Sequence, residues 1–171
     1  MLQEKRPPNI KNKLIRSKLA PLPKSNRPKR ELLGMKKCRR TKCETCDFVK
    51  EGKTLKATAT NTTAYINAAV DCSTENYIYL INCKKCRLQY VGKSSQQFST
   101  RMGQHRSYVT KNQLFKATGE HFNSLAHRLS DFECSILEKV HNKDPMFLTV
   151  REEYWIRKFN TKYKGMNKNK C

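Results

Sequence analysis

The sequence predicts an α/β fold of the α+β kind, in which helices flank a small, three-stranded and mostly antiparallel sheet. Two short apolar runs on either side of a polar Cys-x-x-Cys segment, within residues 77–92, are typical of a β-hairpin. A third apolar run at 132–140 is expected to be the remaining strand, and residues 96–110 and 144–160 have apolar side chains at helical spacing. Together these elements define a domain over residues 76–168.

Charge and cysteine usage narrow the class of protein. Lys and Arg number 36 against 14 Asp and Glu, and the net charge of +22 is typical of nucleic-acid binding, with an anionic membrane surface second. No apolar run approaches the roughly 18 residues that cross a bilayer, and the first residues lack the apolar core of a signal peptide. Eight cysteines without an export signal, including two Cys-x-x-Cys pairs, favour zinc binding over disulfides and a location in the cytosol or nucleus.

Residues 1–34 hold five of the six prolines and many Lys and Arg side chains. Such a segment cannot bury enough apolar surface to offset the entropy of ordering it, so we expect a basic, disordered arm. Four of its cations are candidate contacts to nucleic-acid phosphates: Lys5, Arg6, Lys29 and Arg30. A solvated linker to an upstream domain is an equally good interpretation, and the two are compatible.

Residues 35–75 are expected to form a zinc knuckle. Cys43 and Cys46 have the spacing with which two thiolates of one tight turn bind tetrahedral zinc, and Cys38 and Cys72 would complete a four-sulfur site. The segment contains too few apolar side chains to fold unaided, so the metal would supply its stability. The alternative is a loose linker with free thiols.

The hairpin at 77–92 is expected to bring two tyrosines together. Side chains alternate along a strand, so Tyr77, Tyr79 and Ile81 share one face. Antiparallel pairing then brings Tyr79 and Tyr90, one from each strand, side by side across the hairpin.

The first helix is expected over residues 96–110, with Ser94-Ser95 as its N-cap. Arg101 and His105 are four residues apart, so they lie one above the other on a single helix face. Three apolar side chains mark the packed side of this helix: Phe98, Met102 and Val109.

A second, short helix is expected to begin near Thr118 and to end before Ser130. The strand at 132–140 follows it directly. Cys134 in this strand is interpreted as a small core residue rather than as a metal ligand.

The last helix contains the most informative residue of the sequence. It is expected to start at Asp144-Pro145, a capping residue followed by proline at the first helical position. Its apolar stripe consists of Leu148, Trp155, Ile156 and Phe159. Glu152 falls inside this stripe, whereas Glu153 does not. A carboxylate on a packed helix face is costly unless a cation or hydrogen-bond donors meet it, so Glu152 is either functional or part of a structural salt bridge.

Five short motifs, in this order over residues 77–167, resemble the GIY-YIG nuclease family: Tyr77-Ile78-Tyr79, Tyr90-Val91-Gly92, Arg101-x-x-x-His105, Glu152-x-x-Trp155-Ile156 and Gly165-Met166-Asn167. Within that family the chain looks most like the endonuclease domain of Penelope-like retroelements. That closer resemblance lies in the Cys83-Lys84-Lys85-Cys86 knuckle, the upstream cysteines and His121-Phe122. Tyr77 stands where the family motif has glycine, but the tyrosine with the chemical role, Tyr79, is present.

The resemblance implies a metal-dependent endonuclease that nicks DNA. It implies that Glu152 holds one divalent ion, Mg²⁺ or Mn²⁺, with waters and phosphate oxygens as further ligands. Arg101 would neutralise the scissile phosphate. Tyr79 and Tyr90 would orient or deprotonate the attacking water with His105 as helper, and which tyrosine is the base stays open. Asn167 would hydrogen-bond a tyrosine or a phosphate, and Lys93 and Arg106 are further candidate contacts to nucleic acid.

Cys83 and Cys86 need two further ligands for a second zinc site. His121 and His127 bracket the short helix and would complete a Cys2His2 set, with His105 as the competing ligand and His141 as a third choice. Four protein ligands leave no open coordination position, so this zinc would make the hairpin tip rigid rather than catalyse.

The resemblance also implies partners. A nick in DNA would provide a primer end for a reverse transcriptase domain of the same parent polyprotein, with RNA as a second nucleic-acid partner and the nucleus as the place of action. The main alternative is a catalytically silent, zinc-stabilised module that only binds nucleic acid. A zinc-dependent adaptor for a protein partner explains neither the +22 charge nor the order of the motifs.

Overall fold

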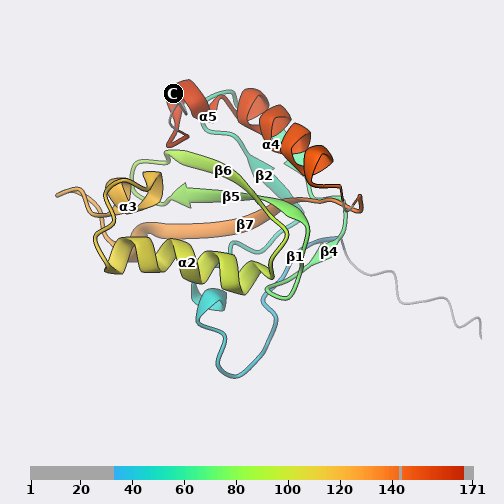
Figure 1. Ribbon diagram of the computed structural model, residues 1–171, viewed down its shortest axis with the longest axis horizontal. Coiled ribbons are helices and arrows are strands. Elements are labelled where there is room, and N and C mark those ends of the chain that lie inside the picture. The colour runs from blue at the N-terminus through green and yellow to red at the C-terminus, as the bar shows by residue number, and fades with distance from the viewer. Residues whose placement is uncertain (1–32, 143, 168–171) are drawn as a thin grey trace, which may run out of the picture. The chain divides into compact units, whose positions relative to one another are not determined.

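A three-stranded antiparallel sheet with strand order β6-β5-β7 organises the protein, whose computed structural model describes residues 33–142 and 144–167 (Figure 1). Its strands are β5 (Tyr77–Cys83), β6 (Gln89–Ser94) and β7 (Phe132–Lys139). Both pairings are antiparallel. The three predicted strands are confirmed, and the predicted fold class with them.

A β-bulge in β7 decides which side of the sheet its acidic residue faces. Ile78 pairs with Glu138, but the next residue of β5, Tyr79, pairs with Ile136. Leu137 is the extra residue, and such an insertion turns the following side chain to the other face. Glu138 therefore reaches α4 (Pro145–Phe159), where it accepts hydrogen bonds from the side chains of Arg151 and Trp155.

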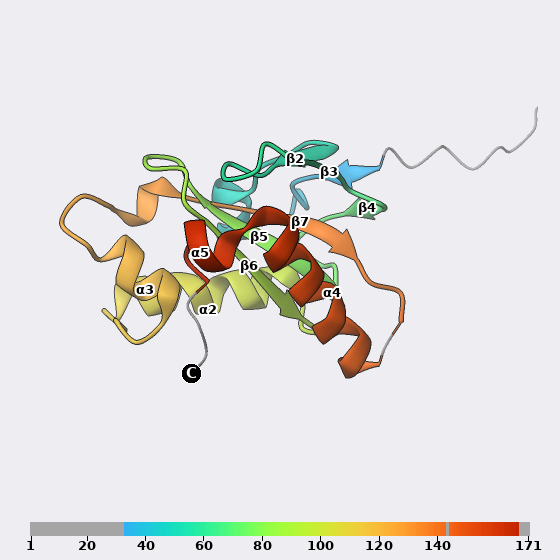
Figure 2. The same ribbon diagram turned by 90° about the horizontal axis from the view of Figure 1, so that it is seen from above.

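The two sides of the sheet are covered by different elements. On one side lie α2 (Phe98–Thr110) and α3 (Ala117–Phe122), and on the opposite side lies the hairpin of β2 (Thr54–Lys56) and β3 (Thr63–Tyr65), as both ribbon views show (Figures 1 and 2). The helix α4 packs along the edge strand β6. The remaining short elements are α5 (Thr161–Lys164) and the 3₁₀ helices η1 (Glu44–Phe48) and η2 (Leu129–Asp131).

One helix cap was predicted correctly and one was not. Asp144 accepts a hydrogen bond from the Met146 N–H at 2.8 Å, so α4 starts as expected. The predicted Ser94-Ser95 cap of α2 is wrong. Because Ser94 still pairs with Tyr77 in the sheet, α2 begins only at Phe98, and its N-cap position has no side-chain cap.

The cysteine-rich segment contains more regular structure than a knuckle. Its strands β1 (Gly34–Met35) and β4 (Ala69–Val70) pair in parallel, and β2 pairs with β3 in an antiparallel hairpin. Although apolar residues are sparse, those at alternate positions face inward, as Leu55 does between exposed neighbours. Met35, Leu55 and Ile66 join the same hydrophobic core as Tyr79 and Ile136. Side chains of residues 35–75 therefore contribute to the same core as side chains of residues 76–167.

Two predictions about the N-terminal arm concern residues outside those described. The arm predicted over residues 1–34 falls almost wholly there, and so do its candidate phosphate contacts Lys5, Arg6, Lys29 and Arg30. Within the described residues, no helix is long and apolar enough to span a membrane.

Candidate active site

The two tyrosines of the hairpin meet as predicted. Their ring centroids are 6.2 Å apart, with Tyr79 fully buried and Tyr90 half-buried. Gly92 lies directly opposite Tyr79 in the sheet. A Cβ atom at Gly92 would overlap the Tyr79 phenol and lie 2.9 Å from the Tyr90 ring. Glycine at position 92 thus makes room for the Tyr79 ring to lie over β6.

A chain of hydrogen bonds connects Tyr79 with α2 and α3. Arg101 Nε donates to the Tyr79 hydroxyl at 3.2 Å, and this hydroxyl lies 2.8 Å from His105 Nε2. His105 Nδ1 lies 2.9 Å from the hydroxyl of Thr118. One assignment satisfies all three contacts: Tyr79 accepts from Arg101 and donates to His105, and His105 donates from Nδ1 to Thr118. The predicted pairing of Arg101 and His105 on one helix face is confirmed.

Burial keeps the side chains of this hydrogen-bond network uncharged, except for Arg101. It raises the pKa of Tyr79 well above its ordinary value, and the nearby Tyr90 adds to the effect, while Arg101 opposes it. Burial, with Arg101 as a second cause, lowers the pKa of His105 to about 3. Near neutral pH, Tyr79 therefore holds its proton and His105 is neutral. An uncharged imidazole can accept the hydrogen bond from Tyr79.

Glu152 lies on the side of α4 that faces β6, as its place in the apolar stripe predicted. Its side chain is 20% exposed and pairs with the Lys93 ammonium at 3.8 Å, whereas Glu153 is exposed. Burial raises the pKa of Tyr90, and the second cause is the negative charge of Glu152. The charge of this carboxylate therefore acts on the Tyr90 phenol.

The donor set around Glu152 fits a divalent ion of the magnesium type. A single carboxylate is enough for such an ion when waters and phosphate oxygens supply its remaining ligands. Glu152 is only partly covered, so its side chain remains accessible to solvent and substrate. Lys93 is also held by the hydroxyl of Thr149, which fixes its ammonium beside the carboxylate.

A cleft of about 440 Å³ opens beside Arg101 and Lys93. Arg101 Nη1 donates to Gln104 Oε1 at 2.7 Å, so the guanidinium is held from two sides, by Gln104 and by Tyr79. Two cations and one carboxylate, that of Asp144, line this cleft, so positive charge exceeds negative charge there and favours an anionic ligand. The cleft therefore suits a phosphate group, which the planar guanidinium can bind through two parallel hydrogen bonds.

Asn167 has a different contact from the one predicted. Its buried side chain accepts from Val91 N at 2.8 Å and donates to Val91 O at 2.7 Å. Both ends of the amide therefore pair with the β6 backbone rather than with a tyrosine or a phosphate. Gly165 permits this approach, because a Cβ atom there would lie 2.5 Å from the Gln89 carbonyl oxygen. Asn167 positions the strand between Tyr90 and Gly92.

The second set of predicted zinc ligands comes together. Donor atoms of Cys83, Cys86, His121 and His127 all lie within 4.8 Å of one another. The Cys83 sulfur is 3.4 Å from His127 Nδ1, and the Cys86 sulfur is 3.5 Å from His121 Nε2. His105, the competing ligand, lies instead against Tyr79. The cluster joins the turn between β5 and β6 to α3 and the segment that follows it.

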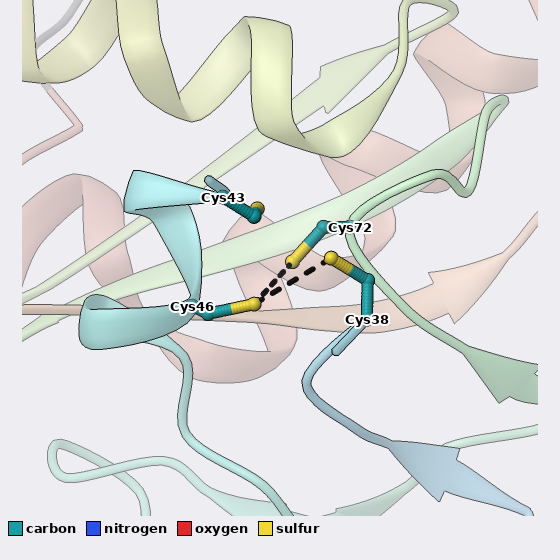
Figure 3. A group of neighbouring side chains, drawn as sticks. All are labelled: Cys38, Cys43, Cys46 and Cys72. Carbon is teal, nitrogen blue, oxygen red and sulfur yellow. Dashed lines mark hydrogen bonds between the residues drawn. The ribbon is translucent and has the colours of Figure 1, made fainter. Parts of the chain in front are cut away.

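The first cysteine set also converges, from η1 and from the ends of β1 and β4 (Figure 3). The Cys46 sulfur lies 3.5 Å from that of Cys38 and 3.7 Å from that of Cys72. Zinc–sulfur bonds of about 2.3 Å in a tetrahedron place sulfurs about 3.8 Å apart, so this spacing fits zinc. The described cysteines are free thiols, so their sulfurs are available as metal ligands.

Arg106 does not have the position of a nucleic-acid contact, and this prediction needs correction. Its guanidinium donates to the Thr45 hydroxyl at 2.9 Å, pairs with Glu44 at 3.2 Å and lies over the Phe48 ring. Its side chain is only 13% exposed. Arg106 is five residues after Arg101, so it lies on another face of α2, and the presence of η1 on that side depends on the tertiary fold.

Two residues near the tyrosines were not singled out from the sequence. Tyr108 packs against His105, with ring centroids 5.5 Å apart, and it is seven residues after Arg101. The same helical spacing that joined Arg101 and His105 could have identified it. Thr118 gave no such signal, because its contact with His105 depends on how α3 packs against α2.

Comparison with known proteins gives three findings. The family model of the GIY-YIG catalytic domain matches residues 75–167. None of the curated proteins matches the chain. Among solved structures, the catalytic domain of the homing endonuclease I-TevI is similar, with 28% sequence identity over 56% of this chain and 99% of that chain and a TM-score of 0.48.

Proposed function

Because the chain belongs to the GIY-YIG family, whose catalytic domain spans residues 75–167, we propose that it is a metal-dependent endonuclease that nicks DNA by hydrolysis. DNA is the substrate that a nuclease domain of this family implies. The observation that supports hydrolysis most directly is the arrangement around the two tyrosines. Arg101 donates to the Tyr79 hydroxyl, the Tyr79 ring lies 6.2 Å from that of Tyr90, and the charges of Glu152 and Arg101 both act on the Tyr90 phenol.

Arg101 is proposed to bind the scissile phosphate in the cleft beside it. Tyr79 anchors its Nε and Gln104 anchors its Nη1, so the guanidinium is oriented before the substrate arrives. A preoriented cation acts on the developing charge without the cost of reorganisation. The charge of Lys93 at the other wall of the cleft would add to the attraction.

The two tyrosines are proposed to differ in role. Tyr79 has no exposed surface, and its hydroxyl is already engaged by Arg101 and His105, which supports a positioning role. Tyr90 is half-buried, and the charges of both Glu152 and Arg101 act on its phenol, which supports its hydroxyl as the one that would orient the attacking water. His105 Nε2 would accept a hydrogen bond from the Tyr79 hydroxyl. This orients the hydroxyl oxygen toward Arg101 Nε and so keeps the guanidinium in place.

Glu152 would hold Mg²⁺ or Mn²⁺. When bound, such an ion withdraws charge from the phosphate and lowers the pKa of a coordinated water. The two cysteine-containing clusters would each hold a structural zinc ion, because four protein ligands leave no position for a substrate.

We also propose the setting of a Penelope-like retroelement. The Cys83-x-x-Cys86 pair between the tyrosine motifs supports it, since this pair lies beside His121 and His127 as a knuckle of that kind requires. The nick would then provide a 3′ end for reverse transcription in the nucleus, with RNA and a reverse transcriptase domain as partners. A nicked product whose end a polymerase cannot extend would contradict this setting.

Nicking of a supercoiled plasmid tests the main proposal. Wild-type protein is expected to nick with Mg²⁺, and Glu152→Ala is expected to abolish nicking while DNA affinity stays within a few fold. Glu153→Ala is the matched control, because it removes the neighbouring but exposed carboxylate of the same helix. Equal nicking by Glu152→Ala would exclude Glu152 from the site. Tight DNA binding without nicking by the wild type would favour the silent binding module.

A further inference from the structure

A second pocket of about 440 Å³ lies away from the cleft beside Arg101. Its walls are the β2–β3 hairpin, which lies across the sheet from α2, and the turn between β5 and β6 (Figures 1 and 2). Leu80 lines it from the β5 face opposite to that of Tyr79. None of the candidate catalytic residues lines this pocket.

The pocket is basic at its rim and apolar at its floor. Lys56, Lys84 and Arg87 line it and are exposed, and within residues 33–142 and 144–167 none of the three forms an ion pair. A fourth cation, Lys50, is paired with Glu133 at 3.4 Å. The floor includes the buried side chains of Leu55 and Leu80. Three uncompensated cations above an apolar floor suit an anion that also has apolar parts.

Hydrogen bonds hold the two walls of the pocket in fixed positions. The buried Gln89 side chain donates to Lys56 O at 2.9 Å and accepts from Thr58 N at 3.0 Å. The Thr58 hydroxyl donates to Arg87 O at 2.9 Å and so joins the hairpin to the turn. The walls are therefore oriented before a ligand arrives, which reduces the entropic cost of binding.

Arg87 occupies a backbone conformation that does not favour arginine. Its φ is 63°, in the left-handed region where glycine is strain-free and asparagine is tolerated. Of the six non-glycine residues with positive φ in the described ranges, four are asparagines, and the others are Arg39 and Arg87. Each arginine directly follows a cysteine of one cluster. The two differ in their surroundings, because the Arg87 side chain lines the pocket and that of Arg39 does not.

We propose that this pocket binds the phosphodiester backbone of a nucleic-acid strand, as a second site separate from the cleavage cleft. Lys56, Lys84 and Arg87 would bind phosphate oxygens, and the apolar floor would pack against the sugar of the strand. The proposal rests on the proposed nucleic-acid substrate but not on its cleavage. The same phosphate chemistry could come from a free anion, so the test includes one.

Arg87→Gly is the informative variant, because it removes the cation and relieves the left-handed backbone. Binding of the zinc-loaded full chain to a labelled single strand and to a duplex is measured by fluorescence anisotropy over a range of salt without Mg²⁺. We expect Arg87→Gly to keep the zinc content and the melting temperature and to bind about tenfold more weakly. The slope of log affinity against log salt should fall by about 0.7 for the single strand and about 0.9 for the duplex.

Arg39→Gly is the matched control. It removes the same charge from the same kind of backbone position beside the other cysteine cluster, outside the pocket. It is expected to leave the salt slope unchanged. Equal losses in Arg39→Gly and Arg87→Gly would overturn the proposal, because they would reflect only the overall charge of the protein.

A double variant, Lys56→Gln with Lys84→Gln, gives a second test that leaves position 87 intact. It should weaken strand binding at least as much as Arg87→Gly. If inorganic phosphate binds the wild type but strand affinity is the same in all variants, the pocket is a site for free anions and the proposal is wrong. If the pocket variants lose strand binding but the wild type does not nick DNA, the pocket proposal stands and the proposed cleavage is refuted.

Discussion

The two cysteine-containing clusters support opposite ends of the candidate active site and do so in different ways. The four-cysteine cluster lies at the start of α2, where Cys72 O accepts from Ser99 N and the Thr45 hydroxyl donates to Ser99 O. The Cys2His2 cluster holds the turn between β5 and β6 to α3. The first therefore supports the helix that contains Arg101, and the second supports the helix that provides Thr118 to His105.

The difference between the clusters is how much other packing surrounds them. The Cys2His2 cluster lies beside a well-packed part of the core, where the Phe122 and Phe132 rings are 5.4 Å apart and β5 pairs with both neighbours. The four-cysteine cluster joins very short strands, β1 and β4, of two residues each. Metal should therefore contribute more to folding at the four-cysteine cluster.

The largest effect is expected from Cys46→Ser. Its sulfur lies next to those of both Cys38 and Cys72, so the variant should lose one zinc ion and most of the structure of residues 33–75. We expect the free energy of unfolding to fall by roughly 5 kcal/mol or more, a fraction of the binding energy of a structural zinc. Zinc content and thermal melting measure this loss.

Cys86→Ser is the counterpart in the other cluster and should be milder. Cys86 is exposed, and its variant is expected to lose one zinc ion. The melting temperature should drop less than in Cys46→Ser, because β5, β6 and α3 keep their core contacts. A larger drop for Cys86→Ser than for Cys46→Ser would reverse the comparison.

Acid should destabilise the protein through His105. The pKa of this group is about 3 when folded, below its ordinary value of 6.5, so the unfolded chain binds the extra proton first. The stability that neutral His105 provides is present above about pH 6.5 and is lost as pH falls toward 3. Urea unfolding at pH 7 and pH 5 should show a smaller loss for His105→Gln than for the wild type. Zinc ligands are the same in both proteins, so their titration cancels in this comparison.

Thr118→Val should lower both the stability of the protein and the rate of nicking. It leaves His105 Nδ1 without its buried partner, which costs about 1–3 kcal/mol and loosens the hold on Tyr79 and Arg101. We expect nicking to fall about tenfold, and Thr118→Ser to restore it because serine keeps the hydroxyl. An unchanged rate of nicking in Thr118→Val would show that the hydroxyl on α3 does not contribute to the active site.

The smallest effect is expected from Arg106→Gln. The pair with Glu44 contributes little because that carboxylate is 85% exposed, but the contacts with Thr45 and Phe48 are more covered. A loss of about 1 kcal/mol in unfolding free energy is expected, with no change in the salt slope of DNA binding. A reduced slope would restore Arg106 as a phosphate contact.

The sequence predicted the features that depend on neighbours in the chain. The hairpin, the Asp144 cap, the shared face of Arg101 and His105 and the exceptional position of Glu152 all follow from spacing within one element. Both ligand sets also followed from cysteine and histidine spacing.

Other contacts between distant elements were beyond that reasoning. Asn167 could be placed in a motif, but its pairing with Val91 depends on how the chain after α5 returns to β6. Arg106 could be placed on a helix face, but not beside η1. The bulge at Leu137, which turns Glu138 toward α4, depends on packing and left no pattern in the sequence.

By itself, the sequence determined the strands of the central sheet, the main helices, their order and the side chains that share a face, because backbone periodicity repeats over short distances. The tertiary structure alone decided that Tyr79 is buried while Tyr90 remains half-buried, and that the cysteine-rich segment shares the core of the nuclease domain. The physical reason is that burial and hydrogen-bond partners are set by which elements pack together. Periodicity within one element cannot specify that.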